Sequence, residues 1–305
     1  MSATIVLSRK LPQPLTIMSL PKAVRIVEVG PRDGLQNESV SLDVATKVEL
    51  IHGLADAGLQ TIEAGSFVSP KWVPQMAGSD EVFKQLSPSH AIYTALTPNM
   101  RGLERAIECN VKEIAVFAAA SEAFSQKNIN CSINESLEKF VAVTEKARAH
   151  NIAVRGYISC VSGCPYQGDV NPNKVSAVAQ SLLEMGCYEI SLGDTIGVAT
   201  PDSIEALLAN ILKTIEPEKL AVHLHDTYGQ AIANIRRSLT MGISIIDSSV
   251  AGLGGCPYAK GASGNVATEQ VIQLLDELGI EHGINLEKLN TLSRYIRQKL
   301  GRPDA

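Results

Sequence analysis

Short apolar runs recur along the chain and alternate with longer amphipathic segments. The runs are rich in β-branched residues and have the length of buried strands. They occupy residues 25–29, 61–65, 91–96, 113–118, 153–159, 188–194, 220–226 and 243–250. Between them, segments such as 43–58 and 135–151 place apolar residues at helical spacing, and Asp43 is well suited to cap the first of these helices. Strand and helix in alternation predict a parallel α/β fold.

The eight strand-and-helix units favour a (β/α)8 TIM barrel over an open, doubly wound sheet. The turn after the first strand also lacks the G-x-G-x-x-G sequence that a dinucleotide-binding sheet would carry there. We therefore expect one TIM-barrel domain over residues 22–305. Residues 1–21, in which three prolines interrupt any helix, are predicted to be a disordered leader. In a TIM barrel the active site lies at the C-terminal ends of the strands.

Composition and charge narrow the class of protein. The 305 residues carry a net charge of -5 without a basic run, which argues against a nucleic-acid partner. No apolar run is long enough to cross a bilayer, so we expect no membrane association. Two-fold dimers are the commonest oligomers, and we expect a homodimer.

The cysteines and the N-terminal residues bear on the compartment. Six dispersed cysteines without a preceding signal peptide indicate a reducing environment, and we expect the cytoplasm. Residues 1–24 contain basic but no acidic side chains, a composition that resembles a transit peptide. The mitochondrial matrix is therefore the alternative.

Ionisable side chains lie at the ends of several predicted strands, where a barrel builds its active site. They are Arg32, Asp33, Glu63, Asp194, His223 and His225. The two histidines are two residues apart in a buried strand, so both imidazoles face the same side. A buried histidine is often only a hydrogen-bonded core residue, but a second imidazole and a strand-end aspartate favour a metal site. Ligand softness alone would suit Mn, Fe, Zn or Co better than Mg.

The charged residues around this site allow two interpretations. Arg32 and Asp33 could form an ordinary surface ion pair, or Arg32 could stabilise an oxyanion that develops during a reaction. Glu63 and Asp194 are likewise predicted to be catalytic carboxylates, and the alternative is that they only position Arg32 and the histidines through hydrogen bonds.

The segment GLGGCPYAKGASGN, residues 252–265, is rich in glycine and contains a single cysteine, Cys256. It is not a phosphate-binding P-loop, because Lys260 precedes a glycine instead of following one. Two interpretations remain at this point. The segment is either a long surface turn or a flexible loop that brings Cys256 to a substrate.

Six segments of the chain together resemble the hydroxymethylglutaryl-CoA lyase family. They are VEVGPRDGLQNE, SFVSPKWVPQM, RGYISCVSGCPYQG, YEISLGDTIG, HLHDTYGQA and SSVAGLGGCPYAKGASGN. The Gly-Gly-Cys-Pro-Tyr sequence resembles the lyases rather than the related synthases. The resemblance implies a metal-dependent TIM-barrel enzyme that cleaves 3-hydroxy-3-methylglutaryl-CoA to acetyl-CoA and acetoacetate, in leucine degradation and ketone-body formation.

The resemblance also implies roles for individual residues. The implied metal ligands are Asp33, His223, His225 and Asn265. The implied metal is Mg²⁺ or Mn²⁺, against the softness argument, because availability as well as affinity decides which metal is bound. Arg32 is implied to bind the substrate and polarise its thioester carbonyl, and Cys256 to be the catalytic thiol. Lys127 and Asn128 are implied to contact the CoA moiety.

The chemistry of the reaction agrees with these roles. Breaking the carbon–carbon bond requires the tertiary hydroxyl to lose its proton, the departing enolate to be stabilised, and its carbon to be protonated. A metal serves the first requirement, Arg32 the second and the thiol of Cys256 the third. The glycines of segment 252–265 would let it close over the substrate while Asn265 anchors its far end at the metal.

Two alternative functions are open. One is an acetyl-CoA-dependent Claisen condensation synthase of the same metal-dependent barrel group, which would share Arg32 and the metal site. Such synthases usually carry a long regulatory extension, for which we expect no room after the eighth unit. The other is a catalytically inactive binding barrel, against which the combination of metal ligands, Arg32 and Cys256 argues.

Overall fold

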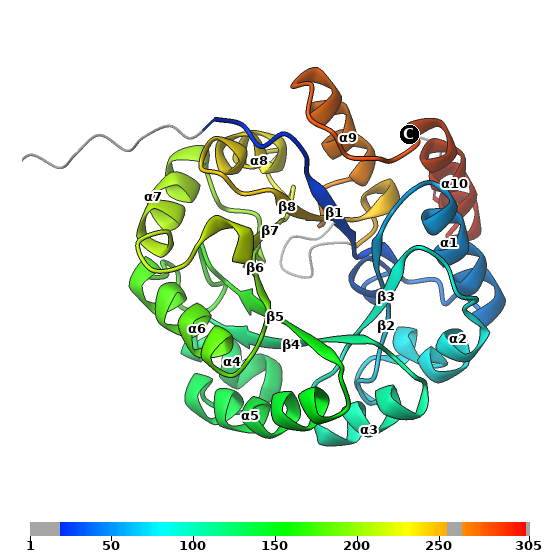
Figure 1. Cartoon of the computed structure of the whole chain (residues 1–305), viewed down its shortest axis with the longest axis horizontal. Coiled ribbons are helices and arrows are strands. Elements are labelled where there is room, and N and C mark those ends of the chain that lie inside the picture. Colours follow the sequence, from blue (N-terminus) through cyan, green and yellow to red (C-terminus); the bar gives the residue numbers. More distant parts are fainter. Residues whose placement is uncertain (1–18, 255–263, 303–305) are drawn as a thin grey trace, which may run out of the picture.

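The computed structural model describes residues 19–254 and 264–302, and within them eight parallel strands close into a barrel (Figure 1). Each strand pairs with the next along the chain, and the last pairs with the first. The strands are β1 (Arg25–Glu28), β2 (Thr61–Ser66), β3 (Ile92–Leu96), β4 (Glu113–Ala119), β5 (Ala153–Ser159), β6 (Glu189–Asp194), β7 (Leu220–Leu224) and β8 (Ile245–Ser248). The predicted (β/α)8 TIM barrel is confirmed. Residues 1–18, most of the predicted leader, lie outside the described residues.

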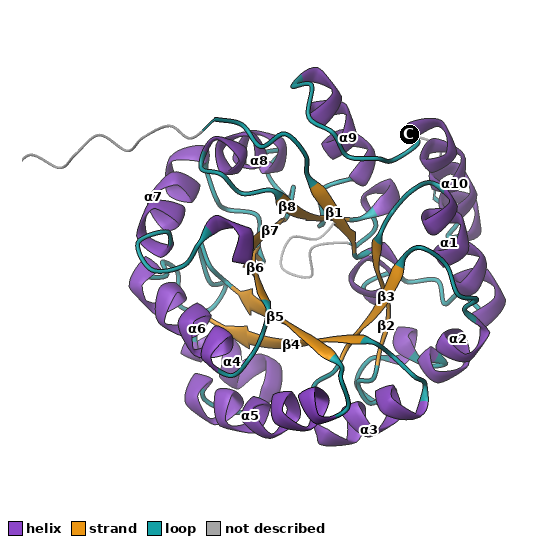
Figure 2. Ribbon diagram, viewed as in Figure 1, coloured by secondary structure: helices purple, strands orange, loops and turns teal. Residues whose placement is uncertain are grey.

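Helices surround the ring of strands and cover its outer face (Figure 2). They are α1 (Val44–Asp56), α2 (Ser79–Gln85), α3 (Met100–Glu108), α4 (Glu122–Ile129), α5 (Ile133–Ala149), α6 (Pro172–Glu184), α7 (Pro201–Ile211), α8 (Ala231–Thr240), α9 (Thr268–Glu277) and α10 (Leu286–Lys299). Short helical turns are η1 (Gly30–Gly34), η2 (Pro74–Met76), η3 (Pro217–Lys219) and η4 (Val250–Gly252). Across the described ranges, the helices are all too short or too polar to traverse a membrane.

The helix starts follow from capping side chains. The carboxylate of Asp43 accepts a hydrogen bond from the backbone N–H of Thr46, so Asp43 caps α1 as predicted. Helix α5 begins at Ile133, slightly before the predicted segment. The reason is a capping box in which Ser132 and Glu135 each accept a hydrogen bond from the other's backbone.

The barrel interior is unusually rich in charge. The main apolar core lies between the strands and the helices, and includes Leu50, Ile114 and Leu182. Inside the ring, Arg155 of β5 binds Asp247 of β8, and these two strands are not neighbours. The contact therefore crosses the interior, where bulky apolar side chains usually fill a TIM barrel.

A buried carboxyl group, Glu28, lies at the end of β1 and ties the strands to the segment that follows β8. Its Oε1 accepts hydrogen bonds from the backbone N–H groups of Gly30 at 2.8 Å and Val250 at 2.9 Å. Its Oε2 accepts the hydroxyl of Thr268 at 2.7 Å. Burial raises the pKa of Glu28 to about 8, although these hydrogen bonds act in the opposite direction.

Because of this raised pKa, we expect Glu28→Gln to stabilise the protein at pH 8 but not near pH 4.5. Below pH 4.5 the carboxyl is protonated in both the folded and the unfolded chain. Between pH 4.5 and about 8 only the unfolded chain ionises, so the free energy of unfolding of the wild type falls as pH rises. The loss is at most about 1.4 kcal/mol per pH unit. The glutamine retains the buried neutral shape and avoids this loss.

The measurement is urea unfolding of wild type and Glu28→Gln, both metal-free, at several pH values from 4.5 to 8. The difference between the two free energies should widen with pH in favour of the variant. Glu108→Gln, at the exposed end of α3, is the control and should leave the pH dependence as in the wild type. A constant difference between wild type and Glu28→Gln would contradict the expectation.

Candidate active site

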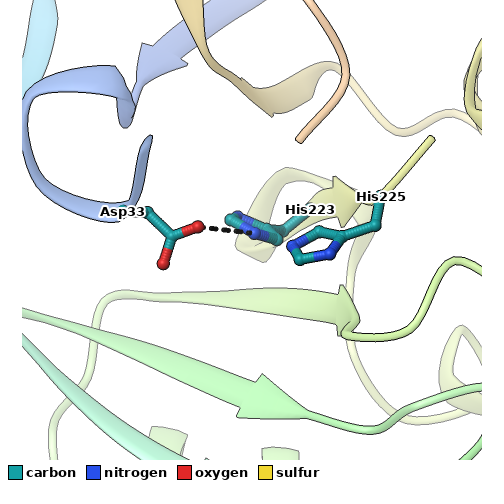
Figure 3. A group of neighbouring side chains, drawn as sticks. All are labelled: Asp33, His223 and His225. Atoms are coloured by element: carbon teal, nitrogen blue, oxygen red, sulfur yellow. Dashed lines mark ion pairs between the residues drawn. The ribbon is translucent and has the colours of Figure 1, made fainter. Parts of the chain in front are cut away.

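Asp33, His223 and His225 converge at the C-terminal ends of the strands (Figure 3). One ligand atom from each lies within 4.8 Å of the other two. Asp33 comes from η1, which follows β1, His223 comes from β7, and His225 directly follows the end of β7. The two imidazole centroids are 5.5 Å apart, and Nε2 of His223 is 3.8 Å from Oδ2 of Asp33. The predicted convergence of these three side chains is therefore observed.

The second histidine lies just beyond the strand that was expected to contain it. Strand β7 ends at Leu224, whereas the sequence pattern predicted a strand to residue 226. His225 instead forms an isolated antiparallel bridge with Asn265. That bridge brings Asn265 to the site, where its Nδ2 donates to Oδ2 of Asp33 at 2.8 Å. The far end of the glycine-rich segment is thus anchored against Asp33.

The protonation states favour binding of a cation. Burial raises the pKa of Asp33, but the adjacent guanidinium of Arg32, together with the neighbouring histidines, outweighs this and holds the pKa well below its usual range. Burial and the neighbouring His223 lower the pKa of His225 to about 4. At neutral pH Asp33 is therefore a carboxylate and His225 a neutral imidazole, the forms that bind metals.

The donor set fits a divalent metal. It offers the carboxylate of Asp33 and two buried imidazoles, and Asn265, whose Nδ2 donates to Asp33, lies beside them. Within the part of the chain that the structure describes, Nδ1 of His225 is buried without a hydrogen-bond partner. Since buried polar atoms are normally satisfied, the cluster is arranged for a ligand that the protein alone does not supply.

Arg32 lies beside the cluster and forms an ion pair with Asp33, but Arg32 is only 6% exposed, so this is not an ordinary surface ion pair. Its Nε donates to Oε2 of Glu63 at 2.6 Å, and its guanidinium lies 5.6 Å from the ring centroid of Tyr157. Burial alone would lower the pKa of Arg32, but the negative charges of Glu63 and Asp33 have the larger effect and raise it above its usual value. The guanidinium therefore stays cationic. Glu63 thus binds Arg32 directly, and its role in the reaction stays a prediction.

The other predicted site residues have different surroundings. Asp194 is buried at the end of β6 and accepts hydrogen bonds from the backbone N–H groups of Val198 and Ala199, so these bonds order the turn after β6. Lys127 and Asn128 lie exposed in the last turn of α4. Cys256 lies outside the described residues, and its predicted role stays a prediction.

Comparison with known proteins identifies the family. A family model described as HMGL-like matches residues 23–296. The chain belongs to the HMGL-like family. Among similar proteins of this family is the 3-hydroxy-3-isohexenylglutaryl-CoA/hydroxy-methylglutaryl-CoA lyase of Pseudomonas aeruginosa, 59% identical over 286 residues that cover 93% of this chain and 95% of the relative.

A second relative and a crystal structure are also similar to this chain. The mitochondrial hydroxymethylglutaryl-CoA lyase of Rattus norvegicus is 56% identical over 285 residues, which cover 93% of this chain and 88% of the relative. A crystal structure of hydroxymethylglutaryl-CoA lyase from Pseudomonas aeruginosa superposes with a TM-score of 0.92 at 59% identity. The superposition covers 94% of this chain and 96% of that one.

Two side chains of this HMGL-like site were missed by sequence reasoning. The ring centroid of Tyr157 lies 5.6 Å from the guanidinium of Arg32 and 5.0 Å from that of Arg155, and the ring meets His223 edge-on. Asp247 accepts a hydrogen bond from His223. No local signal singled them out, because their contacts with residues of other strands form only when the barrel closes.

Proposed function

We propose that this chain cleaves 3-hydroxy-3-methylglutaryl-CoA to acetyl-CoA and acetoacetate with the help of a divalent metal. The observation that carries the proposal is the convergence of Asp33, His223 and His225 beside the buried cation Arg32. This site lies in a chain more than half identical to hydroxymethylglutaryl-CoA lyases over nearly its whole length. The same similarity favours the lyase over a condensing synthase or an inactive barrel.

In this proposal the metal is Mg²⁺ or Mn²⁺. Its ligands are Asp33, His223, His225 and Asn265. A bound divalent metal lowers the pKa of a hydroxyl group that it coordinates, and so assists loss of the substrate's hydroxyl proton. The protein's contribution is to hold these four side chains together in a buried, preorganised group.

Arg32 stabilises the negative charge that develops when the carbon–carbon bond breaks. The departing acetyl group leaves as a thioester enolate, whose oxygen gains charge in the transition state. A guanidinium that Glu63 holds in place and that is shielded from water stabilises this charge more strongly than the same group would in solution. Arg32 therefore binds the thioester oxygen, and Glu63 is its positioning residue.

The enolate must then be protonated on carbon, and Cys256 is proposed as the acid. A thiol has an ordinary pKa of about 8.5 and can donate a proton near neutral pH. The glycine-rich segment 252–265 is proposed to close over the bound substrate. Its end at Asn265 is held against Asp33, so closure would bring the segment toward the metal ligands.

Further proposals concern CoA binding, the shape of the site, and the oligomer, location and metabolic role of the protein. Lys127 and Asn128 are proposed to contact the CoA moiety, for which their exposure on α4 leaves them free. Asp194 is proposed to shape the site through the turn after β6. We further propose a cytoplasmic homodimer with the mitochondrial matrix as the alternative location, and a role in leucine degradation and ketone-body formation.

Loss of the amide ligand should weaken metal binding more than it lowers turnover. We expect Asn265→Ala to bind Mn²⁺ about 10- to 100-fold more weakly than the wild type, with partial recovery of rate at excess metal. Electron paramagnetic resonance of free Mn²⁺ measures the affinity. Asn234→Ala, a substitution at an equally buried asparagine of α8 that binds the backbone of Ala199, is the matched control and should keep wild-type affinity. Equal affinity in Asn265→Ala and wild type would remove Asn265 from the metal site.

Metal dependence tests the proposed function as a whole. Protein stripped of metal with a chelator should form no acetoacetate from 3-hydroxy-3-methylglutaryl-CoA, and added Mg²⁺ or Mn²⁺ should restore the activity. The product is measured with a coupled dehydrogenase assay. Full activity of the stripped protein, verified metal-free by elemental analysis, would contradict the metal-dependent mechanism.

A further inference from the structure

Asp247 is a fully buried carboxylate of β8 that none of the roles above uses. It is 1% exposed and lies inside the barrel, below the mouth where the metal ligands converge. Nδ1 of His223 lies 3.2 Å from its Oδ2, and the hydroxyl of Ser191 donates to the same oxygen at 2.7 Å. The structure therefore places a carboxylate directly behind one of the two imidazoles.

The other partners of Asp247 determine the direction of this hydrogen bond. Both of its oxygens accept from Arg155, whose Nη1 and Nη2 lie at 3.0 and 2.7 Å. Ser191 also donates to it, so Asp247 is surrounded by donors and acts as an acceptor throughout. The proton between Asp247 and His223 consequently belongs on Nδ1 of the imidazole.

Asp247 is itself held firmly. Arg155 binds Glu189 of β6 through its Nε at 2.7 Å, and Arg25 of β1 binds the same carboxylate from the other side. These four side chains form a row of alternating charge, half-buried at Arg25 and buried at the other three, here called the lumen row: Asp247, Arg155, Glu189 and Arg25. Contacts to three different strands leave Asp247 little freedom to move.

The two histidines differ in whether the ring nitrogen Nδ1 has a hydrogen-bond partner. Nδ1 of His223 has a carboxylate partner, whereas Nδ1 of His225 has no partner among the described residues. With a proton on Nδ1, His223 presents the lone pair of Nε2, and this is the nitrogen that lies 3.8 Å from Asp33. The arrangement makes His223 the better oriented of the two potential ligands.

We propose that Asp247 is a positioning residue that fixes the Nδ1–H tautomer and the ring orientation of His223, and so sets the affinity of the site for its divalent metal. The proposal rests on the metal site of the proposed function but not on the reaction. The lumen row serves to keep Asp247 in place, which explains why charge fills an interior that is usually apolar.

The test compares Asp247→Asn with Glu189→Gln. An asparagine at 247 removes the negative charge behind His223 and replaces one carboxylate oxygen by an NH2 group that faces a donor neighbour, so the hydrogen bond from Nδ1 of His223 is weakened. Glu189→Gln disturbs the same Arg155 from its other side but does not touch His223. Both variants should lower the thermal stability, because each weakens a buried ion pair.

Only Asp247→Asn should weaken metal binding, by about 10- to 100-fold for Mn²⁺ measured by electron paramagnetic resonance. Glu189→Gln should bind Mn²⁺ within about 2-fold of the wild type. Unchanged affinity in Asp247→Asn, or an equal loss in both variants, would overturn the proposal. These affinities need no substrate, so the proposal can fail while the lyase activity stands, and the reverse also holds.

A second measurement does not require either variant to fold. Histidine-selective ¹⁵N NMR of the metal-free wild type reports which ring nitrogen carries the proton in each imidazole. The signals of His223 are assigned by their loss in His223→Gln. The tautomer is determined at a pH at which the ring carries a single proton, and we expect that proton on Nδ1 with Nε2 unprotonated. Protonation of Nε2 alone would overturn the proposal.

Discussion

Arg32→Lys is expected to lower kcat by about 100- to 1,000-fold, with little change in KM. Lysine retains the charge but loses the planar guanidinium that binds Glu63 through Nε and lies 5.6 Å from the ring centroid of Tyr157. A flexible ammonium at this position cannot hold the geometry that the developing enolate requires. The measurement is steady-state kinetics on 3-hydroxy-3-methylglutaryl-CoA at saturating Mn²⁺.

The matched control is Arg105→Lys. Arg105 of α3 also pairs with a carboxylate, Asp80 of α2, and its guanidinium lies 5.2 Å from the ring of Phe67, but it is remote from the metal ligands. This variant should keep wild-type kcat. An unchanged kcat in Arg32→Lys would remove Arg32 from the mechanism.

Cys256→Ala is expected to lower kcat by about 100- to 10,000-fold while leaving the affinity for Mn²⁺ unchanged. The thiol is proposed to move a proton and to bind no metal, so its loss should affect only the chemical step. Turnover and Mn²⁺ affinity are measured on the same preparation. Cys187→Ala, at a buried cysteine of the core, is the control and should leave turnover intact even where stability falls.

Turnover and Mn²⁺ affinity together distinguish the proposed role of Cys256 from that of Asn265. Loss of the thiol should not be rescued by excess metal, whereas loss of the amide should be rescued in part. Wild-type turnover in Cys256→Ala would return the glycine-rich segment to its simpler interpretation as a surface turn.

The fold could be predicted from the sequence because its signals are local. Each of the eight strands is a short apolar run flanked by amphipathic segments, and this periodicity does not depend on distant contacts. The cap at Asp43 could also be predicted, because an aspartate directly before a helix accepts a hydrogen bond from a free backbone N–H of its first turn. The end of β7 was placed two residues too late, because pairing of residue 225 with residue 265 is a long-range contact.

The site could be predicted in part. The barrel rule brings residues after different strands to one mouth, so Asp33 and the two histidines could be grouped from sequence alone. Asn265 has no such local signal and came from resemblance to a family. Its contact with Asp33 joins residues 232 positions apart, and only the closed barrel brings them together.

The charged interior could not be read from the sequence. A charged residue in a strand is expected to face solvent, and Arg155, Glu189 and Asp247 would each be costly to bury alone. They are acceptable only because they satisfy one another across the ring. This mutual arrangement exists once the barrel closes, so it is a property of the tertiary structure.

The most direct test of the account is the product analysis of the wild-type protein. Purified protein loaded with Mn²⁺ is incubated with 3-hydroxy-3-methylglutaryl-CoA, and acetoacetate and acetyl-CoA are quantified together over time. We expect the two products to appear in equal amounts as the substrate disappears. Protein that binds Mn²⁺ but forms no acetoacetate above the background of a protein-free control would contradict it.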